Sequence, residues 1–244
     1  MVYWIYYGKD VSLLREDITS IPVTDVFDEH DGCPICRMRD LLETRVTDYI
    51  TGAAMMEPDV RQETNDRGFC LTHYRQLLKK RARLPVALMM ESRLAEVEKQ
   101  VFAGVPLFGK SAKKQASGAE KVLSSCFVCE RVDWAMTRLL ATVCRLWENE
   151  RDFRDSFEQQ EHLCLPHFEL LVQVASQTMN KKNVGDFAKA SSTLCRKYLE
   201  ELRGDVSHFC KMFDYRNSSD ENADWGNSRD SIERSVAWLC GREP

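Results

Sequence analysis

The feature that most constrains this chain is a cysteine and histidine pattern that occurs twice. The two motifs of the pattern are separated by 33 residues in the first copy and by 34 in the second. Aligning the copies on their first cysteine also matches Asp40 with Asp133, and Asp59 and Arg61 with Asp152 and Arg154. We interpret the chain as carrying a duplicated unit. The motifs are Cys33-Pro34-Ile35-Cys36 with Cys70-Leu71-Thr72-His73, and Cys126-Phe127-Val128-Cys129 with Cys164-Leu165-Pro166-His167.

Three cysteines and one histidine form a ligand set that tetrahedral zinc favours. A Cys-x-x-Cys turn lets two thiolates converge on one point, and Cys-x-x-His places both side chains on one face of a helix. A redox Cys-x-x-Cys would need alternating strands and helices around it, and the sequence has no such pattern. We therefore expect each copy to fold around its own metal ion, with two zinc ions per chain. The predicted ligands are Cys33, Cys36, Cys70 and His73 in the first copy, and Cys126, Cys129, Cys164 and His167 in the second.

Four protein ligands close a zinc site, whereas catalytic zinc keeps a position open for water. We therefore expect structural sites and identify no catalytic residue. An iron–sulfur cluster with the same ligands is the alternative metal centre. Several other cysteines and histidines lack a counterpart in the other copy, which favours roles in the core or on the surface. They are Cys144, Cys195, Cys210, Cys240, His30, His162 and His208.

Hydrophobic residues recur at helical spacing after each Cys-x-x-Cys and over residues 85–102, 165–179 and 184–213. No segment alternates as a strand does. We predict an all-α protein, built from a duplicated Cys3His helix-pair module plus C-terminal helices. The expected divisions are an N-terminal extension (1–20), a first module (21–102), a linker (103–121), and a second module with the C-terminal helices (122–244). A capping box at Asp230 and Glu233 predicts a closing helix that ends at Gly241.

Residues 104–111 read GVPLFGKS, which matches the phosphate-loop pattern letter for letter. That loop works only between a buried strand and a helix, because its backbone amides must surround the phosphates. The preceding segment here is a charged helical pattern, and the following segment is small and polar. We interpret these residues as part of the linker rather than as a nucleotide site.

Composition is that of a soluble globular protein, with 43% hydrophobic and 30% charged residues. The net charge of −4 argues against nucleic-acid binding, which depends on a basic face. The apolar run near the N-terminus is too short for a signal peptide, and no stretch approaches a membrane-spanning length. We expect a cytoplasmic protein with no membrane association, whose cysteines stay reduced. Its oligomeric state is left open.

Five stretches resemble an uncharacterised bacterial family, domain of unknown function 6062, and the resemblance extends from Ile21 to Gly241. The chain has Gly52-Ala53-Ala54-Met55 where we expect Gly-Pro-Ser-Tyr or similar in the family, which affects a local loop and not the ligands. The resemblance supports the architecture and implies no activity. The stretches are IPVTDVFDEHDGCPIC, MMEPDVRQETNDRGFCLTH, CFVCERVD, LCLPHF and FDYRNSSDENADWGNSRD.

Three functions are compatible with these features. The favoured one is a zinc-stabilised, non-catalytic interaction or regulatory protein that binds an unknown protein partner. A redox- or metal-responsive zinc switch is the second, because oxidation of a thiolate cluster can release its metal. An enzyme of unidentified class is the third, and it has no activated nucleophile or acid–base pair in its support.

Overall fold

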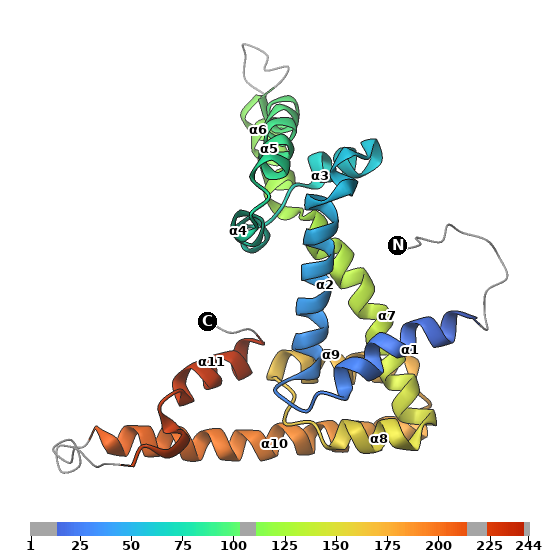
Figure 1. Cartoon of the computed structure of the whole chain (residues 1–244), viewed down its shortest axis with the longest axis vertical. Coiled ribbons are helices and arrows are strands. Elements are labelled where there is room, and N and C mark those ends of the chain that lie inside the picture. The colour runs from blue at the N-terminus through green and yellow to red at the C-terminus, as the bar shows by residue number, and fades with distance from the viewer. Residues whose placement is uncertain (1–13, 103–110, 214–223, 242–244) are drawn as a thin grey trace. The chain divides into compact units, whose positions relative to one another are not determined.

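A computed structural model describes residues 14–102, 111–213 and 224–241, and within these ranges every regular element is a helix (Figure 1). The predicted all-α fold is confirmed. Short 3-10 or π turns lie at Ala53–Met56, Glu98–Phe102 and Gly226–Ser228. The α-helices are α1 (Leu14–Phe27), α2 (Pro34–Thr51), α3 (Pro58–Arg67), α4 (Leu71–Lys79), α5 (Arg83–Val97), α6 (Ser111–Ser124), α7 (Phe127–Asn149), α8 (Arg151–Glu158), α9 (Leu165–Thr178), α10 (Lys181–Met212) and α11 (Ser231–Cys240).

Both copies of the sequence pattern produce the same series of helices. A long helix (α2 or α7) follows the first cysteine, a short helix (α3 or α8) starts at the Asp-x-Arg step, and a third (α4 or α9) starts inside Cys-x-x-His. Pro58 and Asp59 lie in the first turn of α3, where a proline and an acidic residue are both favourable. The Asp-x-Arg step is thus a helix start.

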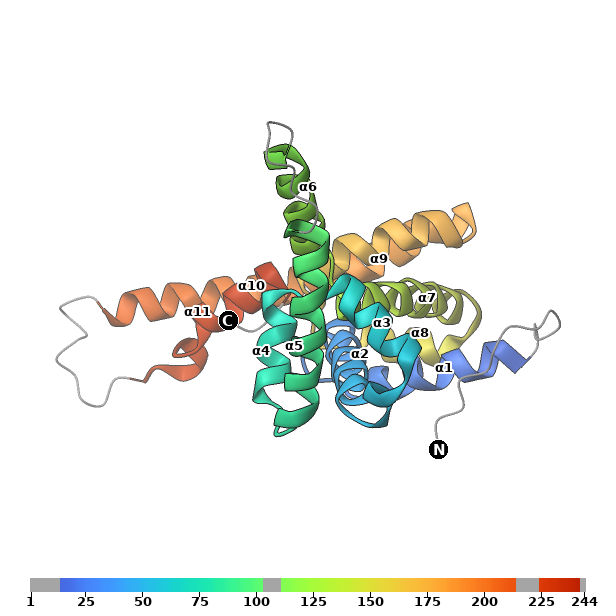
Figure 2. The ribbon, with the colours of Figure 1, turned by 90° about the horizontal axis from the view of Figure 1, so that it is seen from above.

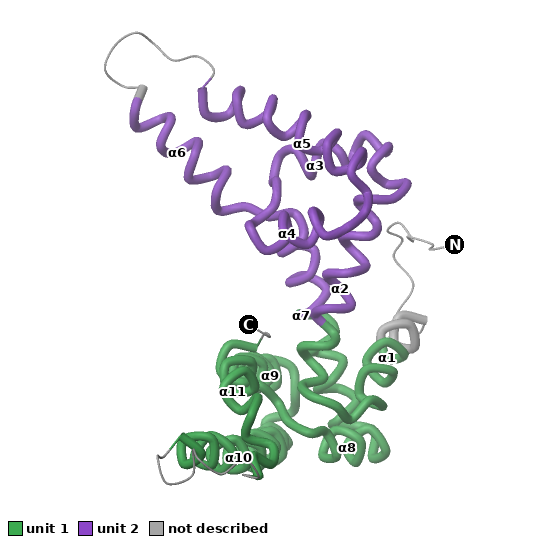
Figure 3. Tube along the Cα trace, turned by 60° about the vertical axis from the view of Figure 1, so that its left-hand side comes forward, with its two compact units in different colours: residues 1–38, 137–244 green, residues 39–136 purple. Residues whose placement is uncertain are grey.

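The described chain divides into two compact units (Figure 3). Unit 1 comprises residues 1–38 and 137–244, and unit 2 comprises residues 39–136. The sequence predicted instead that one unit would follow the other along the chain, with boundaries near residues 102 and 122. Both α2 and α7 contribute residues to each unit, so the N-terminal part of the chain belongs with the C-terminal part.

Two further segments differ from the expected boundaries. Residues 111–121, predicted to be linker, lie in helix α6, and Gly118 of that helix approaches the backbone of Gln100 closely. The rest of the predicted linker, residues 103–110, lies outside the described residues, as does most of the phosphate-loop match. Helix α1 begins within the predicted N-terminal extension and ends at Phe27.

The core of unit 1 contains a cluster of aromatic rings that pack against one another. Phe27 of α1 packs against Phe153 and Phe157 of α8, with ring centroids 5.0 and 5.8 Å apart. Phe187 of α10 continues the set through Phe157 at 5.4 Å and Trp147 at 5.2 Å. All five side chains are buried, so helices from both ends of the chain share one core.

Unit 2 packs α5 against both α3 and α4 (Figure 2). Its buried side chains include Ile50, Leu77 and Met89. On α2, Leu41 and Arg45 are exposed. Two of the buried positions on α2, Glu43 and Thr47, are polar and therefore gave no hydrophobic signal in the sequence.

The predicted closing helix is confirmed as α11. It ends at Gly241, whose φ of 71° is a left-handed conformation that glycine adopts without strain. Trp238 is buried, and its indole Nε1 donates a hydrogen bond of 3.0 Å to the Leu163 carbonyl. The helix contacts α9 and α10, so it docks on the body of unit 1.

Candidate metal centres

The structure gathers the eight predicted ligands into two groups, and each group takes half of its members from each copy. This overturns the expectation that each copy would fold around its own metal ion. The pairing is nested: the first and last motifs of the chain meet, and the two middle motifs meet. We call Cys33, Cys36, Cys164 and His167 the outer site, in unit 1, and Cys70, His73, Cys126 and Cys129 the inner site, in unit 2.

The donor atoms of each site lie close enough together to bind one ion, since all of them are within 4.8 Å of one another. With metal–sulfur bonds of about 2.3 Å and metal–nitrogen bonds of about 2.0 Å, the edges of such a tetrahedron are about 3.8 Å and about 3.6 Å. The sulfur–sulfur distances are 3.7 Å (Cys36–Cys164) and 3.8 Å (Cys70–Cys129). The sulfur–Nδ1 distances range from 3.1 to 3.7 Å. Each group can therefore hold a metal ion.

Every ligand pair lies at the N-terminus of a helix. Cys70 and Cys164 are the N-cap residues of α4 and α9, while Cys33 and Cys126 directly precede α2 and α7. In each case the carbonyl of this cysteine accepts the first i to i+4 hydrogen bond of the helix. The positive end of the helix dipole therefore faces each site and favours thiolate over thiol.

The outer site is fixed by contacts from several parts of unit 1. The Sγ atom of Cys36 lies 3.3 Å from the carbonyl oxygen of Gly241, which places the end of α11 against the site. The carbonyl of Leu163, next to Cys164, accepts hydrogen bonds from the Cys195 thiol and from Trp238. These contacts join the site to α10 and α11 as well as to its own helices.

The inner site is closed by a backbone contact between segments far apart in the sequence. The amide of Phe127 donates to the Gly68 carbonyl at 2.9 Å, which aligns the start of α7 with the turn before Cys70. Gly68 has a φ of 60°, and a Cβ at this position would collide with the guanidinium of buried Arg93. Arg93 also donates to the carbonyls of Asn65 and Asp66, so it supports the turn that delivers the ligand.

Helix length explains why the motifs exchange partners. His73 lies beside Glu43, in the middle of α2. Glu43 is seven residues beyond Cys36, which is about 10 Å along a helix. The short return through α3 therefore brings Cys-x-x-His back only to mid-helix, too far from the N-terminus of α2 to share an ion with the motif that begins it.

In the inner site the Cys126 thiol and the His73 imidazole are hydrogen-bonded, and each shifts the pKa of the other. Burial opposes charge on Cys126, but hydrogen bonds from His73 and from the Cys129 amide lower the pKa of the Cys126 thiol to about 6. Burial likewise opposes protonation of His73, but its hydrogen bond to Cys126 and the nearby carboxylate of Glu43 raise its pKa to about 10. A metal ion needs neutral imidazole and thiolate, so metal binding would release protons here.

Glu43 is the residue of this site that the sequence interpretation missed. Its carboxylate Oε1 lies 3.6 Å from Nε2 of His73, on the side of the ring away from the sulfurs. A charged residue on the buried face of α2 was the available signal, because acidic side chains are almost never fully buried without a partner.

The cysteines and histidines predicted to lie outside the sites do so among the described residues. Cys144 and Cys195 are buried, and burial raises the pKa of their thiols to about 11 and about 12. Cys210 and Cys240 are exposed. His162 stacks on Tyr198 with ring centroids 3.9 Å apart, which is a packing role.

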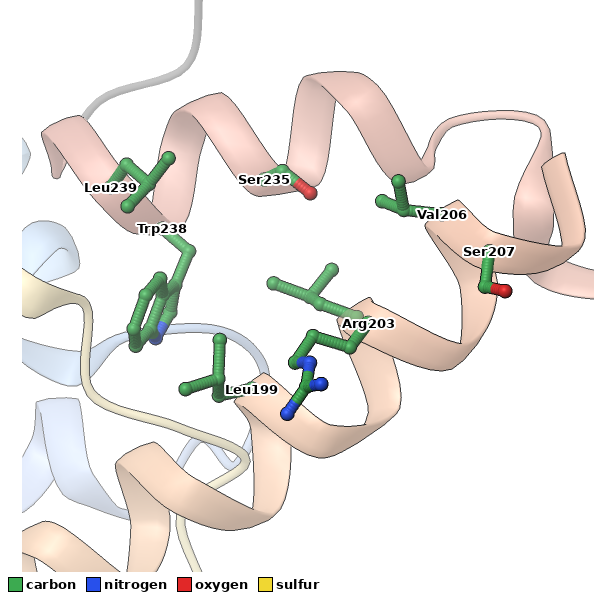
Figure 4. A pocket seen from close by; sticks show the side chains of 8 residues that line it. Leu199, Arg203, Val206, Ser207, Ser235, Trp238 and Leu239 are labelled. Carbon is green, nitrogen blue, oxygen red and sulfur yellow. The ribbon is translucent and has the colours of Figure 1, made fainter. Parts of the chain in front are cut away.

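A pocket of about 430 Å³ lies along the seam between α10 and α11 (Figure 4). Leu199, Leu202 and Val206 of α10 face Trp238 and Leu239 of α11 across it. The remaining lining residues are Arg203, Ser207 and Ser235, with no histidine, cysteine or carboxylate among them. The lining therefore provides apolar contacts rather than a pair of groups for proton transfer.

A model for a family of unknown function, DUF6062, matches residues 14–244. The chain belongs to this family. Membership covers both metal-ligand groups and every described helix, in agreement with the resemblance found in the sequence. No curated protein and no solved structure matches the chain.

Within residues 14–102, 111–213 and 224–241, no helix combines the length and the apolar character needed to cross a bilayer.

Proposed function

We propose that this DUF6062 protein binds two structural zinc ions and serves as a non-catalytic interaction or regulatory protein. The observation that carries the proposal is the geometry of the two donor sets. Each provides three sulfurs and one nitrogen within 4.8 Å of one another, and the sulfur–sulfur distances of 3.7 Å (Cys36–Cys164) and 3.8 Å (Cys70–Cys129) match the edge of a zinc tetrahedron. All four positions are protein donors, and zinc with four protein ligands stabilises a fold rather than activating water.

The same distances argue against an iron–sulfur cluster. In a cluster the protein ligands bind different iron atoms around a core of inorganic sulfide, so their donor atoms spread farther apart than around one ion. Donors that all lie within 4.8 Å of one another suit a single ion. A borderline-soft ion such as zinc matches the mixture of thiolate and imidazole.

A redox- or metal-responsive switch is the second candidate, and the exposure of the thiols favours it. Cys36 of the outer site and Cys70 and Cys129 of the inner site are only partly buried. An oxidant can therefore reach a ligand of either site, and oxidation of one thiolate removes a ligand and loosens the ion.

The test is the metal content of full-length protein purified without added metal, measured by elemental analysis together with an absorption spectrum. The proposal predicts two zinc ions per chain and no visible band. Iron with a visible band, or less than one metal ion per chain, would contradict it. Mild peroxide followed by a reductant tests the switch, which requires reversible loss of zinc.

A further inference from the structure

One ring nitrogen of the inner-site histidine is left without a partner. Nδ1 of His73 lies among the three sulfurs, at 3.2 to 3.4 Å from them. Nε2 is buried and makes no hydrogen bond within the described chain. The side chain is only 1% exposed, so water does not reach this nitrogen from the surface. A buried N–H without an acceptor is costly, and it points to the nearest group able to accept.

That group is the carboxylate of Glu43, itself only 3% exposed. Its Oε1 is 3.6 Å from His73 Nε2, a few tenths of an ångström beyond hydrogen-bond length. Arg39 donates to Oε1 at 3.3 Å, and Gln76 donates to Oε2 at 2.7 Å. Arg39 also pairs with Asp133 of α7, the helix that Cys126 and Cys129 begin, so the carboxylate belongs to a network spanning the site's helices.

A carboxylate behind a ligating histidine fixes the orientation and tautomer of the ring and makes its other nitrogen a stronger donor to the metal. We propose that Glu43 is a positioning residue of this kind, and that it makes the inner site the tighter of the two metal sites. The outer site is then the one from which metal exchanges first. This inference rests on the proposed metal binding at both sites.

The outer site has no equivalent support among the described residues. His167 forms no ion pair with a carboxylate in the described parts of the chain, where the histidine ion pairs are those of His73 and His162. The repeat alignment explains the difference, because the position of Glu43 in the first copy is occupied by Met136 in the second. The two copies therefore share the same metal ligands but differ at the position that Glu43 occupies beside the ligating histidine.

The experiment uses the full chain loaded with two zinc ions. It is titrated with EDTA, and free thiols are alkylated with iodoacetamide and counted peptide by peptide by mass spectrometry. We expect Cys33, Cys36 and Cys164 to be labelled at lower EDTA concentration than Cys70, Cys126 and Cys129. Labelling of both groups at the same concentration, or of the inner group first, would overturn the inference. Labelling of all six before EDTA is added would instead refute the proposed metal sites.

The variant Glu43→Gln keeps the size of the side chain and removes its charge. Loss of such a partner typically lowers metal affinity by about 10- to 100-fold. The inner cysteines should therefore be labelled at correspondingly lower EDTA concentration, with the outer cysteines unchanged. Glu91→Gln, the same change at an exposed position of unit 2, is the control and should behave as the unsubstituted chain. An inner site that releases metal normally in Glu43→Gln contradicts the assignment.

A second readout separates positioning from simple support of the fold. With ¹¹³Cd in place of zinc, each site gives its own resonance, whose chemical shift reports the donor strength of the ligands. Glu43→Gln should move the inner resonance alone, while the circular dichroism spectrum of the loaded chain stays unchanged. A purely structural role predicts a changed spectrum or two unmoved resonances. If the variant fails to fold, the order of labelling in the unsubstituted chain still decides the question.

Discussion

At the scale of single residues, backbone conformation and buried charge decide how the ligands are delivered. Gly68 precedes the second motif with a φ of 60° and ψ of −153°, a region open essentially to glycine. A Cβ at this position would lie 2.6 Å from Nε of Arg93. Arg93 cannot simply move aside, because it caps carbonyls of α3 from a buried position. The Cys-x-x-His motif by itself predicts neither the backbone conformation of Gly68 nor the lack of space for a Cβ beside Arg93.

Gly68→Ala should therefore destabilise unit 2 by roughly 2 kcal/mol, from backbone strain together with displacement of Arg93. Urea unfolding of the zinc-loaded chain measures the loss. Gly204→Ala is the matched control, since a Cβ there meets nothing within 4 Å and lies in helix α10. A loss no larger than that of the control would mean that the turn relaxes.

Glu148 gives the molecule a pH dependence at the start of α10. Its Oε1 accepts hydrogen bonds from the Asn180 amide, the Asn180 side chain and the Asn183 side chain, at 3.1, 2.8 and 2.6 Å. The Asn180 side-chain bond is the largest influence, and together these bonds hold the pKa of Glu148 below its ordinary value of 4.5. The stabilisation is thus fully present above the unfolded-state pKa and is lost as the pH falls through the lower, folded-state pKa.

We expect the difference in unfolding free energy between the unsubstituted chain and Glu148→Gln to be constant near neutral pH. It should shrink as the pH falls through and below the ordinary glutamate pKa, because the carboxylate then takes up a proton in both states. Denaturation of both proteins over a pH series gives the difference directly, and acid-driven metal loss common to both cancels. A difference independent of pH would show that the charge contributes nothing.

At the scale of elements, the sequence predicts most of the helices but not which helices pack against one another. Hydrophobic spacing predicted α5, α9 and α10, because each buries one stripe of apolar side chains, whereas the Asp230 and Glu233 pattern with Gly241 predicted α11. Helix α6 was predicted to be linker, since its small and polar residues carry little hydrophobic signal. Its assignment depends on packing, with Gly118 allowing close approach to the backbone at Gln100.

Helix α11 provides the sharpest test at this scale. Trp238 anchors this helix beside the outer site, and the carbonyl oxygen of Gly241 at its end lies 3.3 Å from Cys36 Sγ. Trp238→Ala should cost about 3 kcal/mol in the stability of unit 1, through the lost ring and its hydrogen bond. It should also make Cys36 and Cys164 react with iodoacetamide at lower EDTA concentration.

Val236→Ala, a change at a half-exposed position of the same helix, serves as the control. It should leave both the stability and the EDTA dependence close to those of the unsubstituted chain. An outer site that keeps its metal equally well in Trp238→Ala would show that α11 and the outer site are independent.

At the scale of the whole molecule, the nested pairing defines which parts of the chain depend on one another. The outer site joins residues 33–36 to 164–167, and the inner site lies within the segment between them. Each site belongs wholly to one compact unit, although each unit draws on both copies of the repeat. Loss of one ligand should therefore affect one unit across both copies, rather than one copy.

Cys70→Ser tests the pairing directly. The variant should lose one of two zinc ions, and Cys126 and Cys129 should become reactive toward iodoacetamide while Cys33, Cys36 and Cys164 stay protected. Pairing within each copy predicts the opposite, with Cys33 and Cys36 exposed and Cys126 protected. Cys164→Ser should give the reciprocal result, and Cys210→Ser, at an exposed cysteine outside both sites, should retain both ions.

The sequence by itself determined the helical class, the eight candidate ligands and the closing helix, because spacing along a helix and donor chemistry are local properties. Only the tertiary structure decided which motifs meet, where the units divide, and that Glu43 lies behind His73. Two nearly equal spacings are compatible with either pairing. The pairing depends on the length of the long helix in each copy compared with that of the short helix that follows it. Packing between segments distant in the sequence decides where the chain then lies.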